Sequence, residues 1–323
     1  MPRRFHNPPP AVNVKTRRAF RATLLRWYRR HRRALPWRGT RDPYRVWVSE
    51  IMLQQTRVET VRDYYRRWLR EFPTLAALAR APVTRVLKLW EGLGYYSRAR
   101  NLHRAARQIR GRVPETVAEL QQLPGIGRYT AGAIASIAFG QRAPVVDGNV
   151  ARVFTRVFAR TDRHWELAEV LLPSRNCGDF NQALMELGAL VCLPVQPRCE
   201  KCPLRNVCRR GRLPVRRRPP LRRVTESVLF VQRQGQIWLR QRPAQGLLAG
   251  LWELPAGRSG KLLLTLRHVI TNRQITLRVL AGRPHGAGRW FSRRQLQAIT
   301  MSAAHRRAVE QILSELVESG RPS

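Results

Sequence analysis

The sequence contains few acidic residues and almost no lysine. Of its 323 residues, 20 are Asp or Glu and 61 are Lys or Arg, which gives a formal net charge of +41. Lysine occurs only at Lys15, Lys88, Lys201 and Lys261, so arginine carries nearly all of the positive charge. Such an excess attracts polyanions, and nucleic acid is the obvious one. Codon bias can produce the same excess, so the charge supports DNA binding without establishing it.

Long uncharged apolar stretches are also absent. None approaches the roughly 18 residues that a membrane helix needs. The first ten residues, MPRRFHNPPP, lack the apolar run of a signal peptide. We therefore expect a cytoplasmic, nucleoid-associated protein with no membrane partner. The Pro and Arg residues at the start predict a disordered tail over residues 1–14.

The sequence contains only five cysteines, an odd number, which argues against a disulfide framework. Four of the five cysteines follow the spacing Cys-x6-Cys-x2-Cys-x5-Cys, at Cys192, Cys199, Cys202 and Cys208. Four thiolates this close together fit a tetrahedral zinc ion or a [4Fe–4S] cluster, and the spacing alone leaves both open. Basic residues surround them, so a metal centre here is expected to stiffen a loop suited to phosphate. Cys177 lies outside the spacing and is expected to be an inert thiol.

Length and periodicity predict two domains. A chain of 323 residues exceeds the usual size of a single core. Apolar residues recur every three or four positions up to about residue 188, as at Phe20, Leu24 and Trp27. This period predicts a mainly α domain over residues 15–210. The basic run that follows predicts a linker over residues 211–223.

After the linker the pattern changes from helical to strand-like. The apolar runs VLFVQ and IWLRQ flank the turn signal Gln234-Gly235, and further strands are predicted over residues 262–270 and 274–280. A helix predicted over residues 302–316 follows them. We therefore expect a smaller α+β domain over residues 224–323.

Two short motifs in the helical domain are candidates for chemistry. The first, Leu-Pro-Gly-Ile-Gly, contains Gly125 and Gly127 between two predicted helices. Its backbone N–H groups can face outward at the start of the next helix and bind phosphate, although an ordinary turn between helices needs glycine as well. Twenty residues later, Asp147 begins the motif Asp-Gly-Asn, which an amphipathic helix follows.

Together these motifs resemble the helix-hairpin-helix base-excision glycosylases and, within that superfamily, the MutY-type adenine DNA glycosylases. The resemblance runs from about residue 15 to about residue 316. It is carried by the four clustered cysteines and by Leu35-Pro36-Trp37-Arg38, Ser49-Glu50-Ile51-Met52-Leu53-Gln54-Gln55-Thr56, Gly92-Leu93-Gly94-Tyr95-Tyr96 and Val146-Asp147-Gly148-Asn149-Val150. It implies a mainly α fold, with a helix-hairpin-helix glycosylase domain and an iron–sulfur cluster loop, followed by a smaller α+β Nudix-like domain. It also implies a [4Fe–4S] cofactor over residues 192–208. The implied partner is double-stranded DNA with an A:8-oxoguanine or A:G mispair, bound by a monomer.

The resemblance assigns roles to individual residues. It implies that Glu50 protonates adenine, that Asp147 stabilises the sugar cation or acts as a transient nucleophile, and that Asn149 assists. It implies that Gln55 and Tyr95 fill the gap that a flipped base leaves. Further residues that it places at the DNA are Arg38, Gln54, Gly125 and Gly127.

The chemistry itself gives a reason for two carboxyl groups. Breaking a purine N-glycosidic bond requires an acid that protonates the base and a carboxylate that stabilises the oxocarbenium-like sugar. Glu50 sits among Val46, Val48 and Ile51, and an apolar setting raises the pKa of a carboxyl group toward neutrality. Asp147 precedes a helix, whose N-terminal partial charge favours the ionised form. The plainer interpretations are a solvated glutamate and an ordinary N-cap aspartate.

The lack of lysine bears on strand cleavage. Bifunctional relatives carry a hairpin lysine whose amine forms a Schiff base with the sugar. The matching position here is Tyr129, and no lysine occurs between Lys88 and Lys201. The sequence therefore predicts a monofunctional enzyme that leaves an abasic site, with Tyr129 shaping the pocket or serving only structure. The alternative, a pyrimidine-lesion glycosylase and AP lyase of the endonuclease III type, lacks its nucleophile.

The second domain resembles a Nudix-like domain at residues 246–255, GLLAGLWELP. A Nudix phosphohydrolase needs clustered carboxylates for Mg²⁺, yet no Asp or Glu occurs between Glu253 and Glu310. We therefore expect a recognition module. In the family this domain reads 8-oxoguanine through a Phe-Ser-His element. Residues 270–272, Ile-Thr-Asn, correspond to it, and Thr271 keeps a hydroxyl group that can hydrogen-bond the lesion.

Overall fold

The computed structural model describes residues 12–214, 220–270 and 272–318. Thr271, the expected lesion contact, lies outside the described residues. None of the described helices combines the length and the apolar composition that a membrane crossing requires.

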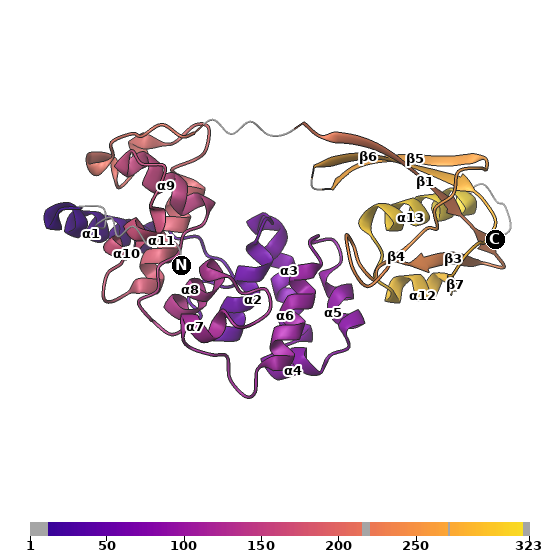
Figure 1. Ribbon diagram of the computed structural model, residues 1–323, viewed down its shortest axis with the longest axis horizontal. Helices are drawn as coiled ribbons and strands as arrows, with labels where there is room; N and C mark the ends of the chain where they lie inside the picture. Colours follow the sequence, from indigo (N-terminus) through magenta and orange to yellow (C-terminus); the bar gives the residue numbers. More distant parts are fainter. Residues whose placement is uncertain (1–11, 215–219, 271, 319–323) are drawn as a thin grey trace, which may run out of the picture. The chain divides into compact units, whose positions relative to one another are not determined.

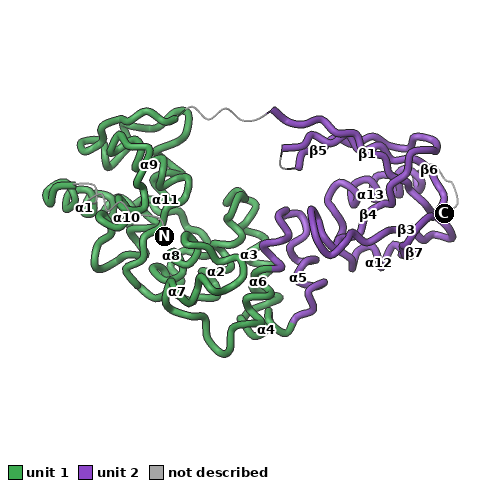
Figure 2. Tube along the Cα trace, in the orientation of Figure 1, with its two compact units in different colours: residues 1–80, 101–216 green, residues 81–100, 217–323 purple. Residues whose placement is uncertain are grey.

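The chain divides into two compact units (Figure 2). The first contains residues 1–80 and 101–216, and the second contains residues 81–100 and 217–323. Residues 81–100 therefore belong with the C-terminal part of the chain, although they lie between segments of the first unit in the sequence.

The first unit is built from helices joined by short loops (Figure 1). They are α1 (Val14–His31), α2 (Pro43–Leu53), α3 (Val58–Glu71), α4 (Leu75–Arg80), the greater part of α6 (Ser97–Gln108), α7 (Val117–Leu120), α8 (Arg128–Ile137), α9 (Gly148–Phe158), α10 (His164–Leu171) and α11 (Cys177–Leu190). Two single 3-10 turns follow, η1 (Cys199–Lys201) and η2 (Arg205–Val207).

Polar side chains set where several of these helices begin. The Asn13 side chain accepts a hydrogen bond from Thr16 N at the start of α1, and Asp42 accepts one from Arg45 N at the start of α2. Each cap satisfies a backbone N–H group that has no partner within its helix. Pro43 occupies the first position of α2, where a missing N–H group costs nothing.

The core of the first unit joins α1, α9, α10 and α11. Phe20, Leu24, Phe154 and Phe180 are fully buried in one cluster. Burying each such side chain contributes about 1.5–3 kcal/mol relative to leaving it in water. This packing fixes α9 and α11 against each other, and their neighbouring ends carry the candidate active site.

The second unit combines two small sheets with helices. In one sheet, β6 (Arg273–Ala281) lies between β1 (Arg222–Phe230), which runs parallel to it, and β5 (Leu262–Ile270), which runs antiparallel. In the other, β3 (Gln236–Gln241) pairs antiparallel with β2 (Gln232–Arg233), β4 (Trp252–Glu253) and β7 (Arg289–Ser292). Its helices are α5 (Val83–Trp90), the first turn of α6, α12 (Arg293–Ala298) and α13 (Ala303–Glu318).

One hydrophobic core holds both sheets and α13 together. Val228, Leu239, Leu277 and Ile312, from three strands and α13, are almost completely buried in it. The alternation of buried and exposed residues along β6 follows from the pleat of a strand. This core supports the paired strands β5 and β6, and Ile270, the first residue of the expected lesion-reading stretch, ends β5.

The expected fold class, a mainly helical domain followed by a smaller α+β domain, is confirmed. Strands are found on both sides of Gln234-Gly235 and over the two later ranges that the pattern indicated. The sequence analysis missed β4, β7 and α12, because two to six residues carry too little periodicity to stand out.

Candidate active site

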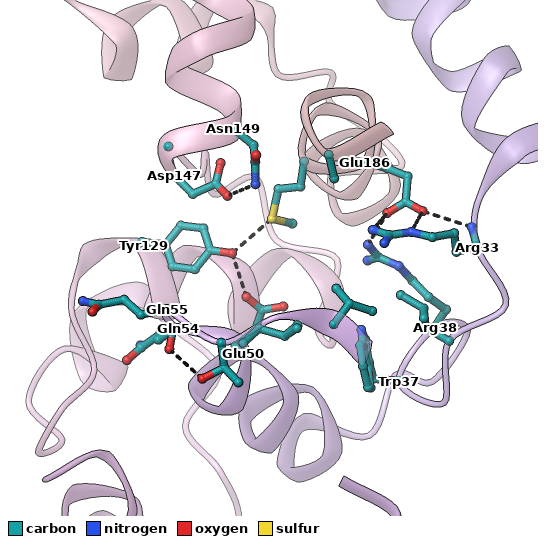
Figure 3. A pocket seen from close by; sticks show the side chains of 17 residues that line it. Arg33, Trp37, Arg38, Glu50, Gln54, Gln55, Tyr129, Asp147, Asn149 and Glu186 are labelled. Atoms are coloured by element: carbon teal, nitrogen blue, oxygen red, sulfur yellow. Dashed lines mark hydrogen bonds and ion pairs between the residues drawn. The ribbon is translucent and has the colours of Figure 1, made fainter. Parts of the chain in front are cut away.

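Both predicted catalytic carboxyl groups line one cavity in the first unit. The cavity has a volume of about 510 Å³ and lies among α2, α8, α9 and α11. Glu50 extends into it from α2, Asp147 lies directly before α9, and Tyr129 lies between them (Figure 3). A shared cavity is the minimum that a reaction using both carboxyl groups requires.

Glu50 is buried and held by Tyr129. Glu50 is only 5% exposed, and the Tyr129 hydroxyl lies 2.8 Å from the Glu50 Oε2 atom. Burial raises the pKa of Glu50, and the nearby Asp147 raises it further, while the Tyr129 hydrogen bond and Arg38 act against the shift. The net direction is upward, which favours the protonated form that a proton donor needs.

Tyr129 remains a neutral phenol in this setting. Burial and the charges of Glu50 and Asp147 raise its pKa well above the ordinary value. A hydroxyl group can donate or accept a hydrogen bond, so its contact with Glu50 persists in either protonation state of that carboxyl. Met185 Sδ lies 3.0 Å from the same hydroxyl and supports it from α11.

Asp147 caps α9 and is held in place through both carboxyl oxygens. Its Oδ1 accepts a hydrogen bond from Val150 N at 2.7 Å, and its Oδ2 accepts one from Asn149 Nδ2 at 2.9 Å. These contacts fix the Asp147 carboxyl group at the N-terminal end of the helix, where the partial positive charge lies. The site thus holds one buried carboxyl group whose pKa is raised and one that N–H donors orient toward the cavity.

Arg152 connects Asn149 to the segment that begins the cysteine loop. Its Nη2 donates to Asn149 Oδ1 at 2.7 Å and to Gly188 O at 2.8 Å, and its Nε donates to Cys192 O at 2.7 Å. At Gly188 a Cβ atom would lie 2.6 Å from Asn149 Cβ, so only glycine permits this approach of α11 to α9. The guanidinium group therefore joins the Asp147 side of the cavity to the first of the four cysteines.

A buried ion pair forms the opposite wall. Glu186, whose side chain is fully buried, accepts hydrogen bonds from Arg33 N, Nε and Nη2 at 2.8–3.0 Å and from Arg38 Nη2 at 3.1 Å. Arg38 also donates to Gln182 Oε1. Arg38 therefore lines the cavity in a fixed orientation, with Trp37 beside it.

The residues expected at DNA are placed in part around the same cavity. Gln54 and Gln55 line it, and Gln54 Nε2 donates to Thr130 Oγ1 at 3.2 Å. In the hairpin, Gly125 has φ +77°, and a Cβ atom there would lie 2.7 Å from Asn101 Cβ. Gly127 is the residue before α8 and faces open space, as a phosphate seat requires.

Tyr95 belongs to the second unit, where it lines a different cavity of about 740 Å³. It is 45% exposed and has φ +46°. His268, Val269 and Ile270, next to the tip of the β5–β6 hairpin, line the same cavity. The expected wedge residue thus shares this cavity with Ile270, the first residue of the stretch that was expected to read the lesion.

The four cysteines lie on one loop that packs on α9. All are free thiols. Arg156 Nη1 donates to Cys192 Sγ at 3.3 Å, and the Cys208 thiol lies 3.4 Å from Arg156 O. Burial, followed by the charges of the other three thiols, raises the pKa of Cys202 to about 11, so the four sulfurs act on one another. Among the described residues no set of three or more side chains stands in metal-ligand arrangement. The donors themselves, four thiols, suit iron or zinc.

Three residues that shape the site were missed by the sequence analysis. They are Glu186, Arg33 and Arg152. Glu186 left a signal, because it lies within the apolar stretch Ala-Leu-Met-Glu-Leu late in its helix. Arg152 left a weaker one, its position three residues after Asn149 on the same helix.

Comparison with known proteins supports the same assignment. Residues 48–171 match the model of the HhH-GPD superfamily base excision DNA repair proteins, and residues 227–311 match a NUDIX domain. A solved structure of a thermostable thymine-DNA glycosylase matches with a TM-score of 0.56 and 35% identity, over 60% of this chain and 96% of that chain.

Several curated relatives are adenine DNA glycosylases. That of Rattus norvegicus is 44% identical, and the match covers 74% of this chain. This chain spans 60% of the length of that relative. An adenine DNA glycosylase of Schizosaccharomyces pombe is 34% identical, and the match covers 75% of this chain and 70% of the yeast protein. The resemblance in the sequence motifs is confirmed, and the chain belongs to the adenine DNA glycosylase family.

Proposed function

We propose that this chain hydrolyses the N-glycosidic bond of adenine mispaired in duplex DNA and leaves an abasic site. The observation that carries the proposal is that two carboxyl groups, Glu50 and Asp147, line one cavity. Burial raises the pKa of Glu50, while N–H donors hold Asp147 at the start of α9. An enzyme that must both protonate a base and stabilise a cation needs this pair.

In this mechanism an adenine nucleotide leaves the base stack and enters the cavity of about 510 Å³. Glu50 donates its proton to a ring nitrogen of adenine as the bond between C1′ and N9 breaks, and the bonding electrons go to the base. The carboxylate of Asp147 stabilises the positive charge on the sugar. Water then adds to C1′ and loses a proton to a carboxylate, which yields adenine and an abasic site.

The cavity offers no amine for a Schiff base. Among the described residues that line it there is no lysine, and Tyr129 occupies the position after the hairpin. Strand cleavage by an AP lyase requires such an amine. These facts favour a monofunctional glycosylase over the endonuclease III type.

We propose a [4Fe–4S] cluster at Cys192, Cys199, Cys202 and Cys208. Four free thiols on one loop, which Arg152 joins to the active site, support it. When bound, the cluster would cross-link the loop, and the chain's own contribution is a basic surface beside it. Purified protein should be brown with absorbance near 400 nm, roughly as thiolate-ligated clusters absorb. Colourless, zinc-loaded protein from iron-rich medium would contradict this proposal.

We propose that the second unit recognises 8-oxoguanine, or guanine, opposite the adenine. The cavity of about 740 Å³ supports this role, because it presents the exposed ring of Tyr95 beside apolar side chains and a few polar groups. Such a surface suits a planar base. The partner would be duplex DNA bound by a protein monomer.

The activity is tested with purified protein and a duplex containing adenine opposite 8-oxoguanine. Adenine should be released, and strand breaks should appear only after hot alkali. Asp147→Asn should lower the rate by about 100-fold or more, while it keeps a side chain that can cap α9. Asp162→Asn is the matched control, since 62% of the Asp162 side chain is exposed and it lies in a surface ion pair with Arg160. Spontaneous nicking, or trapping by borohydride as efficient as that of a lyase, would contradict the proposal.

A further inference from the structure

Glu91 holds together two segments of the second unit that lie more than 200 residues apart in the sequence. Its Oε1 accepts hydrogen bonds from Arg306 Nε at 2.6 Å and from Met301 N at 3.0 Å, and its Oε2 accepts one from Lys88 Nζ at 2.6 Å. The Glu91 side chain is only 13% exposed. Charge-assisted hydrogen bonds are roughly twice as strong as neutral ones, so this carboxylate makes a firm contact.

Lys88 and Arg306 extend the network to the turn before α13. Lys88 Nζ donates to Ile299 O at 3.1 Å, and Arg306 Nη2 donates to the same carbonyl at 2.8 Å. The two cations therefore bind both the carboxylate and the carbonyl. The end of α5 and the turn between α12 and α13 are held as one block.

The residues that follow these contacts line one cavity. Gly94 and Tyr95 come shortly after Glu91, and residues 302–304 come directly after Met301. Both groups line the cavity of about 740 Å³. The hydrogen bond from Met301 N to Glu91 thus joins the two segments that lead into this cavity lining.

A second contact anchors the other end of the Tyr95 loop. Arg100 Nη2 donates to Ala249 O, and Arg100 lines the same cavity. Tyr95 lies between this anchor and Glu91. Its φ of +46° is one that a non-glycine residue adopts only when its surroundings impose it. The loop is therefore fixed at both ends, and the Tyr95 ring projects from it.

We propose that Glu91 is a positioning residue that sets the separation between Tyr95 and the β5–β6 hairpin, and thereby the preference for 8-oxoguanine opposite adenine. The inference rests on the proposed function, because it takes this cavity as the lesion-reading site. Bond breaking by Glu50 and Asp147 uses none of the groups in the Glu91 network. Loss of the network should therefore reduce lesion preference and leave lesion-independent excision in place.

The test compares Glu91→Gln with Glu310→Gln in the full chain. Both residues pair with Arg306, but Glu310 does so at 3.8 Å with 66% of its side chain exposed. Single-turnover excision is measured on an A:8-oxoguanine duplex and on an A:G duplex. Glu91→Gln should lower the ratio of the two rates by about tenfold, as expected for loss of a hydrogen bond between charged groups, and Glu310→Gln should not change it. A parallel fall on both substrates, or an unchanged ratio, would overturn the proposal.

A double-mutant cycle with Tyr95→Ala separates positioning from general damage. If Glu91 acts through the Tyr95 ring, Glu91→Gln should change the ratio little once that ring is gone. Independent, multiplicative effects of the two substitutions would count against the proposal. Should Glu91→Gln fold poorly, Glu91→Asp replaces it, since it keeps the charge and withdraws it from Met301 N, and the same fall in the ratio is expected.

Hydrogen exchange of residues 92–97 tests, apart from the activity, whether the Glu91 network holds this segment in place; this restraint is called the clamp below. Their amides should exchange at least about tenfold faster in Glu91→Gln than in wild type or Glu310→Gln. Unchanged exchange would refute the clamp even if the enzyme is active. Wild-type protein that excises no adenine would refute the proposed function, while faster exchange in the variant would still support the clamp.

Discussion

Replacing Glu186 with glutamine should both destabilise the first unit and disturb the cavity that Glu50 and Asp147 line. The carboxylate is fully buried and receives four hydrogen bonds from Arg33 and Arg38. Breaking a buried ion pair by removing one partner costs about 3–5 kcal/mol. We expect about 3 kcal/mol, the lower end of that range, because 28% of the Arg33 side chain is exposed and keeps part of its hydration.

The assay is urea unfolding at pH 7, followed by circular dichroism at 222 nm, where the helical unit dominates. The matched control is Glu169→Gln, which breaks a pair with Arg142 in which both side chains are nearly half exposed. Such a surface pair contributes below about 1 kcal/mol. Equal losses for the two variants would refute the reasoning. The excision rate should also fall in Glu186→Gln, because Arg38 loses the contact that orients it in the cavity.

The pKa of Glu186 adds a pH signature to this prediction. Burial raises the pKa of Glu186, but the hydrogen bonds from Arg33 and the charge of Arg38 outweigh it, and the net pKa lies below the ordinary value of 4.5. A carboxyl group whose pKa is lowered by folding contributes stability above its ordinary pKa and loses it as the pH falls through the folded-state pKa. The difference between wild type and Glu186→Gln should be full at pH 7 and shrink below 4.5.

Three further perturbations have defined outcomes. Burial raises the pKa of Glu50, so single-turnover excision should fall as the pH rises through that pKa. Glu50→Gln should lower the excision rate by about 100-fold or more. An excision rate that rises steadily to pH 10 would contradict the role of Glu50 as the acid. Gly125→Ala, at φ +77° and against Asn101, should weaken duplex binding by about tenfold or less in a gel-shift assay, roughly the effect of one strained residue, and wild-type affinity would exclude the hairpin from the DNA contact. Cys199→Ser should lower the absorbance near 400 nm and the thermal stability together, and unchanged spectra would remove Cys199 from the ligand set.

The surroundings of the two candidate catalytic carboxyl groups were predictable because local sequence determines them. The apolar neighbours of Glu50 on α2 bury it, and Asp147 caps the helix that its own sequence begins. Each signal lies within a few residues. What no local pattern contained was that Tyr129, 79 residues from Glu50, would hydrogen-bond to it.

The supporting contacts were out of reach for the same reason. Glu186 and Arg33 are 153 residues apart, and only the packing of α11 near the end of α1 brings them together. The Glu91 network spans more than 200 residues. From sequence alone, a charged side chain is predicted to lie at the surface, because its buried partner is not known. The grouping of residues 81–100 with the C-terminal unit depends on contacts of that kind.

Gly188 lacks a Cβ atom, and the candidate reaction centre depends on that lack. A methyl group there would meet Asn149 at 2.6 Å, and Asn149 holds the carboxylate of Asp147. Either the two helices would move apart or the amide would turn away, and in both cases the Asp147 carboxyl group would shift. A residue with no side chain, which takes no part in proton transfer itself, therefore controls the geometry of the candidate centre, and even Gly188→Ala should be among the most damaging substitutions there.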